Sequence, residues 1–205
     1  MPATHPKRRF LSTFVGITLA VLVADQVTKP LVVYFLGRGV ERDLPSFFAH
    51  YFTLFWRFPY RSSGHIVTII GRYLQINFTT NDGMAWGLLK GHPLELSLIS
   101  LVLCILIWWL WRTYGRSGLY LTASLGLIMG GAVGNLIDRF RLKVVVDFVD
   151  TLIPIVNYDF PVFNIADAAA SIGTLMIVIY LFWLDGKRLR RRKRLRVVDL
   201  TEYHA

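Results

Sequence analysis

The apolar positions along the chain gather in four long runs that are separated by more polar segments. The runs lie at about 10–36, 94–111, 119–137 and 164–184. Each is close to the ~20 mostly apolar residues that a helix needs to cross ~30 Å of hydrocarbon. The pattern therefore predicts an integral membrane protein, mainly α-helical, with four transmembrane helices in a single membrane domain.

The first run could be mistaken for a secretory signal peptide, because Lys7, Arg8 and Arg9 stand before it. A cleavage site after Ala24 would need a small residue three positions earlier, where the chain has Leu22. We therefore interpret this run as a membrane span that is retained.

The composition supports a membrane protein. Hydrophobic residues make up 54%, charged residues 18%, and the mean hydropathy is +0.48. A disordered chain is excluded, and an ordinary soluble domain is less apolar. The net charge of +10 comes from basic residues beside the apolar runs, which indicates membrane orientation rather than nucleic-acid binding. The single cysteine, Cys104, excludes an intramolecular disulfide.

The basic residues also predict the orientation of the chain. One group precedes the first span, Arg112 and Arg116 fill the loop between the second and third, and eight lie between Lys187 and Arg196. With four crossings all three groups share one side, which the positive-inside rule assigns to the cytoplasm. Both termini are then cytoplasmic, and the segments of about 37–93 and 138–163 lie outside. The basic run at 187–196, within the cytoplasmic tail at 185–205, is interpreted as an anchor attracted to anionic headgroups, and the alternative is a nucleic-acid or specific lipid site.

The segment of about 37–93 has features of folded structure. Residues 66–78 are rich in β-branched and aromatic side chains, and the sequence TTNDG at 79–83 is typical of a turn. These features predict a small antiparallel sheet outside the membrane, between the first and second spans. The aromatic stretch at 47–58 is expected to be an interfacial strand or helix, and 60–64 a turn.

Polar residues at membrane depth are candidates for function, because burying an ionisable group in lipid is costly. Asp25 and Lys29 are spaced to form an ion pair on one helix face, which can be structural or can orient a nearby site. Asn135 is spaced to face Asp138 and Arg139. That second group is either a polar helix end or a set that positions substrate, and the sequence leaves both open.

Asp147 and Asp167 form the third candidate. Asp147 lies in the apolar run VVVDFVD, and Asp167 lies one turn into the fourth span, where Asn164 is placed to cap the helix. Two carboxyl groups in a partly dry site share one proton, so one acts as base and the other as acid. Such a pair can activate water for attack on an amide. The alternative is that each carboxylate caps a helix or pairs with Arg139 or Arg141.

Other catalytic chemistries find little support. The five histidines have no metal-ligand spacing, and GxSxG, HExxH and Walker sequences do not occur. Ser171 follows Asp167 by four residues, but no histidine lies nearby in sequence to activate it. A metal or serine mechanism is therefore disfavoured.

Five stretches in order resemble the lipoprotein signal peptidase family, also called type II signal peptidases. They are Asp25-Gln26-x-Thr28-Lys29, Asn81-x-Gly83-x-Ala85-Trp86, Gly130–Arg139 (GGAVGNLIDR), Val146-Asp147-Phe148 and Phe163-Asn164-Ile165-Ala166-Asp167. Each stretch alone is weak evidence for the family, because it could occur by chance. Five stretches in the family's order, across most of the chain, are specific evidence.

The resemblance implies an aspartic endopeptidase of the bacterial inner membrane, with its site near the periplasmic face. Its substrates would be diacylglyceryl-modified prolipoproteins, cut just before the lipidated cysteine, and the enzyme would be a monomer in contact with membrane lipids, without cofactor or metal. The implied catalytic pair is Asp147 and Asp167, with Asn135, Asp138, Arg139, Asn164, Asn81, Gly83, Asp25 and Lys29 as binding or supporting residues.

The chain departs from the family pattern in two places. Met84 and Trp86 replace the commoner alanine and phenylalanine, and about 40–64 resembles an insertion that forms a lid or lies on the membrane. The competing interpretation is a small proton-coupled carrier that uses the same aspartates. The crowding of charged groups toward one side and the lack of paired broken spans argue against it. A non-catalytic scaffold is a third possibility.

Overall fold

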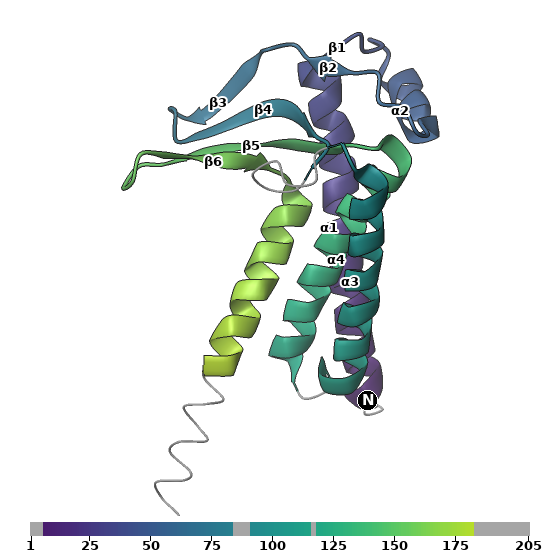
Figure 1. Cartoon of the computed structure of the whole chain (residues 1–205), viewed down its shortest axis with the longest axis vertical. Helices are drawn as coiled ribbons and strands as arrows, with labels where there is room; N and C mark the ends of the chain where they lie inside the picture. Colours follow the sequence, from purple (N-terminus) through teal and green to yellow (C-terminus); the bar gives the residue numbers. More distant parts are fainter. Residues whose placement is uncertain (1–5, 84–90, 116–117, 183–205) are drawn as a thin grey trace, which may run out of the picture.

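Four long helices stand side by side, and a layer of strands lies across one end of them (Figure 1). This computed structural model describes residues 6–83, 91–115 and 118–182. The helices long and apolar enough to cross a membrane are Arg8–Leu36 within α1 (Pro6–Leu36), α3 (Pro93–Tyr114), α4 (Leu119–Leu142) and Ile165–Phe182, which we call the C-terminal span. The predicted four spans are confirmed. Met84, Trp86, Arg116, the end of the fourth span and the basic tail lie outside the described residues.

Glycines of α4 allow this helix to pack closely against its neighbours. A Cβ added at Gly130 would lie 2.6 Å from the Cβ of Val21 in α1. A Cβ at Gly131 would overlap the carbonyl oxygen of Ala166 in the C-terminal span. Small residues at helix contacts are the usual means of close packing in membranes. α4 is thereby held between α1 and the C-terminal span.

The strands form a four-stranded antiparallel sheet in the order β3-β4-β5-β6. Their bounds are Ile66–Ile70, Leu74–Asn81, Val145–Ile153 and Tyr158–Phe163. The predicted sheet is confirmed, but the sequence placed all of it between the first two spans, whereas β5 and β6 follow α4. The reason is that β5 is a central, largely buried strand, and its apolar run VVVDFV lacks the alternation that identifies a half-exposed strand.

Two local predictions need correction. Residues 66–78 form β3 and most of β4, and the chain turns between the two strands at Gly71, which has a φ of +48°. β4 continues through the expected turn at 79–83 as far as Asn81. Residues 60–64 are not only a turn, since β2 (Arg61–Ser62) pairs with β1 (Gly37–Arg38).

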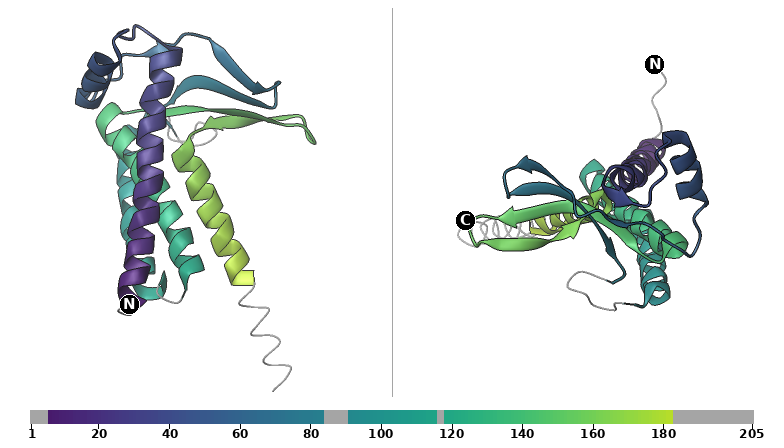
Figure 2. Two further views of the ribbon diagram at one scale, coloured as in Figure 1. Left: turned by 180° about the vertical axis from the view of Figure 1, so that it is seen from behind. Right: turned by 90° about the horizontal axis from the view of Figure 1, so that it is seen from above.

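The first part of the aromatic stretch forms a helix, α2 (Leu44–Thr53), and residues 54–58 form a loop after it. The Asp43 side chain accepts a hydrogen bond from the backbone N–H of Ser46 at 3.0 Å, and this cap begins the helix. Phe47 and Tyr51 are buried against Val33 and Leu36 at the end of α1. α2 and the four-stranded sheet lie on opposite sides of α1 (Figures 1 and 2).

Candidate active site

Asp167 is fixed at the point where the sheet leads into the C-terminal span. β6 ends at Phe163, and Asn164 follows as the helix cap. The Asp167 backbone N–H donates to Asn164 Oδ1 at 2.9 Å, while the Asn164 backbone N–H donates to Asp167 Oδ2 at 3.3 Å. This reciprocal pair is a capping box with aspartate in the usual place of glutamate. The predicted cap by Asn164 is confirmed.

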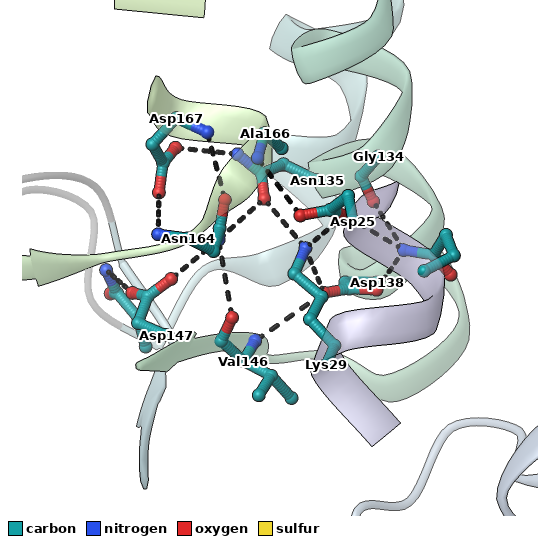
Figure 3. Close-up of polar contacts among 12 residues, drawn as sticks. Asp25, Lys29, Gly134, Asn135, Asp138, Val146, Asp147, Asn164, Ala166 and Asp167 are labelled. Carbon is teal, nitrogen blue, oxygen red and sulfur yellow. Dashed lines mark hydrogen bonds and ion pairs between the residues drawn. The ribbon is translucent and has the colours of Figure 1, made fainter. Parts of the chain in front are cut away.

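Asp147 approaches the same point from β5. It pairs with Thr79 of β4, and its side chain is almost fully buried. Asn164 Nδ2 donates to Asp147 Oδ1 at 2.7 Å, and Asn81 Nδ2 donates to Asp147 Oδ2 at 3.1 Å. Asn164 therefore contacts both aspartates, one through its side chain and one through its backbone (Figure 3).

Asn135 of α4 completes the connection between the two aspartates. Its Nδ2 donates to Asp167 Oδ1 at 2.7 Å, and its Oδ1 accepts from Asn164 Nδ2 at 3.1 Å. The sequence expected Asn135 to face Asp138 and Arg139 on its own helix. Among the described residues, its side chain hydrogen-bonds to Lys29, Asn164 and Asp167 rather than to either of these, because it points across the helix contact toward the C-terminal span (Figure 3).

The surroundings of Asp147 favour its protonated form. Burial, and after it the nearby charge of Asp167, raises the pKa of its carboxyl group to about 7. The hydrogen bonds from Asn81 and Asn164 oppose this shift only in part. Asp167 is only partly buried, so the pair combines a dry carboxyl group with a more accessible one.

A buried charge cluster lies behind the aspartate pair. Lys29 Nζ is 2.7 Å from Asp25 Oδ2 and 2.7 Å from Asp138 Oδ2, and all three side chains are shielded from solvent. The predicted pairing of Asp25 with Lys29 is confirmed, and Asp138 joins it from α4. Gln26 Nε2 donates to Asp138 Oδ1 at 2.9 Å. Gln26 stands in the motif of the first span, but the resemblance implied no role for it.

This cluster is joined to the rest of the site through two contacts. Asp25 Oδ1 accepts from the backbone N–H of Ala166 at 3.0 Å, which ties α1 to the first turn of the C-terminal span. Lys29 Nζ donates to Asn135 Oδ1 at 3.2 Å. Sequence spacing within one helix does not predict either contact, since both cross between elements more than 100 residues apart.

Asn81 and Gly83 lie where β4 ends, beside Asp147. The Gly83 N–H donates to Asn81 Oδ1 at 3.0 Å, and Arg139 Nη2 donates to the Gly83 carbonyl oxygen at 3.3 Å. Among the described residues, Arg139 makes no ion pair within 4.0 Å. The structure therefore gathers all the residues implied by the resemblance in or around one site.

Fold and site together define a multi-pass membrane protein that carries two adjacent carboxyl groups at one end of its helical bundle. Residues 17–183 match the family model described as signal peptidase (SPase) II. The chain belongs to the signal peptidase II family and is therefore a peptidase.

Relatives and solved structures agree with this membership. A lipoprotein signal peptidase of Listeria monocytogenes serotype 4a (strain HCC23) is 37% identical over 83% of this chain and 94% of its own. A lipoprotein signal peptidase of Staphylococcus aureus (strain JH9) is 30% identical over 85% of this chain and 91% of its own length. Two solved structures described as bacterial membrane enzymes are 30% and 31% identical, with TM-scores of 0.67 and 0.63. They cover 84% of this chain and 89% or 94% of their own.

Proposed function

We propose that this protein removes the signal peptide from diacylglyceryl-modified prolipoproteins, cutting just before the lipidated cysteine, in the bacterial inner membrane. Family membership and the names of the relatives support the substrate class. The observation that carries the proposal is the bridging of Asp147 and Asp167 by one asparagine, Asn164. That bridge places two carboxyl groups together at the end of a membrane bundle.

The pair would act as an aspartic protease dyad that shares one proton. Asp147 is the favoured carrier of the proton because it is the more buried, and Asp167 is then ionised. Asp167 takes a proton from water as the water oxygen adds to the scissile carbonyl carbon. The peptide C–N bond then breaks, and Asp147 gives its proton to the amine of the cysteine. A proton shift between the two carboxyl groups restores the starting state.

The position of the site suits a lipid-anchored substrate. Both aspartates lie where the sheet meets the ends of the helices, so the cut occurs near one membrane surface (Figure 1). The acyl chains of the substrate then stay in the bilayer while its amide reaches the pair. The positive-inside rule supports the periplasmic surface and cytoplasmic termini.

A cleavage assay tests the proposal. The purified protein in detergent receives a diacylglyceryl-modified prolipoprotein, and loss of the signal peptide is followed on a gel. We expect Asp147→Asn and Asp167→Asn to lose about a hundredfold to ten-thousandfold in rate, the usual contribution of acid–base groups. Asp150→Asn, on the same strand, is the matched control and should stay near wild type.

Two further arms complete the assay. Unlipidated substrate should not be cleaved, and a chelator should not stop cleavage of the lipidated one. Cleavage that persists in either dyad variant would remove that aspartate from catalysis. Absence of cleavage by folded wild type on several prolipoproteins would overturn the proposed substrate and favour a carrier or scaffold.

A further inference from the structure

An exposed aromatic surface lies beside α2, away from the aspartate pair. It consists of Phe52, Phe55, Trp56 and Phe140, which we call the aromatic patch. All four side chains are exposed, and Phe55 is 60% exposed. The ring of Phe55 lies 5.9 Å from that of Trp56 and 6.0 Å from that of Phe140 in the last turns of α4. The patch is therefore contiguous and joins the α2 segment to a membrane span.

The depth of the patch follows from helix lengths. α1 has 31 residues, so at ~1.5 Å per residue it is about 46 Å long and exceeds the ~30 Å hydrocarbon core. α2 packs against its last turns through Phe47 and Tyr51, and Phe140 lies near the end of the α4 span. These positions place the aromatic patch at the level of the lipid headgroups, where aromatic side chains are favoured.

Three cations lie beside the patch. Lys143 Nζ lies 4.3 Å from the ring centroid of Trp56. The Arg141 guanidinium carbon lies 5.5 Å from the Phe52 ring centroid, and Arg57 is exposed next to Trp56. Within the part of the chain that the structure describes, none of the three has a carboxylate partner within 4.0 Å. The dipole of α4 favours Arg141 at the helix end, but it gives no reason for Arg57.

The backbone holds this arrangement at a cost in conformational energy. Trp56 has a φ of +61° and Lys143 a φ of +63°, a region that bulky side chains rarely adopt. The Trp56 N–H donates to the carbonyl oxygen of Arg141 at 2.5 Å, which fixes the loop after α2 to the end of α4. The strained loop therefore presents Trp56 outward, over the ammonium group of Lys143.

We propose that the aromatic patch, with Arg57, Arg141 and Lys143, is a docking site for anionic phospholipid headgroups in the leaflet on the sheet side. The rings enter the headgroup–acyl boundary, and the three cations meet the phosphates. A zwitterionic lipid fits less well, because its own ammonium group would stand among uncompensated positive charges. α2 lies on the opposite side of α1 from the four-stranded sheet (Figure 2), and the inference does not depend on the proposed peptidase chemistry.

A depth measurement tests the placement of the patch in lipid. In a Cys104→Ala background, Phe55→Cys carries a nitroxide label, and the protein is reconstituted in phosphatidylglycerol–phosphatidylcholine nanodiscs. We expect the label to collide more with oxygen than with a water-soluble nickel complex, as does Ile105→Cys, which faces outward on α3. Greater access to the nickel complex would overturn the proposal and favour a soluble protein partner.

A binding measurement tests the headgroup. Native mass spectrometry follows phosphatidylglycerol and phosphatidylcholine binding to wild type, Arg57→Gln, Lys143→Gln and the double variant. We expect about a fivefold loss of phosphatidylglycerol affinity for each cation removed, with phosphatidylcholine unaffected. Arg72→Gln is the matched control, because Arg72 is an exposed cation in the β3–β4 turn, on the other side of α1.

The two arms separate the possible results. Equal loss in Arg72→Gln, or unchanged phosphatidylglycerol affinity in the double variant, would overturn the headgroup assignment even with Phe55 in lipid. Size-exclusion profiles and melting temperatures check that each variant is folded. If the double variant unfolds, Arg57→Gln decides the question alone, because Arg57 is exposed and, unlike Trp56 and Lys143, is not one of the residues with a positive φ.

Discussion

The side chain of Asn135 has only one amide orientation that satisfies its neighbours. Its oxygen accepts hydrogen bonds from Lys29 and Asn164, and its nitrogen donates to Asp167. A flipped amide would set its NH2 group against two donors. Lys29 therefore acts on the aspartate pair indirectly. It is a positioning residue that keeps the amide nitrogen of Asn135 directed at Asp167.

Replacing Lys29 with methionine should be strongly destabilising. The change leaves Asp25 and Asp138 buried and close together without a cation, and breaking a buried pair in this way costs about 3–5 kcal/mol. Unfolding in detergent, followed by circular dichroism, measures the loss. The triple variant Asp25→Asn, Lys29→Met, Asp138→Asn should recover most of it. If Lys29→Met unfolds like wild type, the cluster does not support the fold.

The raised pKa of Asp147 predicts a pH-dependent contribution to stability. Burial moves the pKa from 3.8 to about 7, so between these values the folded protein holds a proton that the unfolded chain releases. Stability from this group is present at pH 4 and is lost as the pH rises through 7. The shift corresponds to about 4 kcal/mol.

Melting temperatures of wild type and Asp147→Asn across pH 4–8 check this dependence. The variant cannot ionise, so we expect it to become more stable than wild type above pH 7, by an amount that shrinks toward pH 4. Asp150→Asn controls for other titrating groups. A difference that is constant with pH would contradict the raised pKa.

At the scale of elements, α4 is the helix around which the others are arranged. Its glycine face allows the backbone of the C-terminal span to approach closely, and the same helix supplies Asn135 and Asp138 to the site. The hydrogen bond from Asn135 to Asp167 therefore depends on how closely α4 packs against the C-terminal span. A wider helix separation would move Asn135 away from Asp167.

Gly131→Ala should destabilise the protein by about 1–3 kcal/mol, the usual range for overpacking. The added methyl group meets the backbone carbonyl of Ala166, which cannot move without the C-terminal span. Gly16→Ala in α1 is the matched control, since a Cβ there meets nothing within 4 Å, and its stability should stay within about 1 kcal/mol of wild type. Thermal unfolding in detergent compares them, and equal stability would contradict the tight contact.

At the scale of the whole molecule, the site exists only where the sheet joins the bundle. Asp147 comes from β5, Asp167 from the C-terminal span, Asn135 from α4 and Lys29 from α1 (Figure 3). No single element holds the two carboxyl groups together. Their separation depends on the register of β5 against β4 and on the short path from β6 into the C-terminal span.

The proposed orientation predicts which positions a membrane-impermeant maleimide reaches in spheroplasts. In a Cys104→Ala background, Ile155→Cys at the β5–β6 turn should be labelled, because this side chain is 94% exposed at the sheet end. Tyr114→Cys, exposed at the opposite end of α3, should be labelled only after the cells are broken. The reverse pattern would place the termini outside.

Much of this arrangement could be predicted because local patterns carry it. The four spans follow from the length of the apolar runs, and the pairing of Asp25 with Lys29 follows from helix spacing. The capping by Asn164 follows from residue type at a helix start. The partner of Asn135 could not be predicted in this way, because it lies on another helix 32 residues away.

Local patterns in the sequence were enough to predict the membrane class, the four spans, the presence of a sheet and the residues that gather in the candidate site. These features depend on hydrophobicity, length and motifs, which are local properties of the chain. Three features became visible only in the folded chain: β5 and β6 complete the sheet, Asp138 pairs with Lys29, and Asn135 donates to Asp167. The physical reason is that such contacts depend on how closely helices approach and on strand register, which are set by packing over the whole molecule.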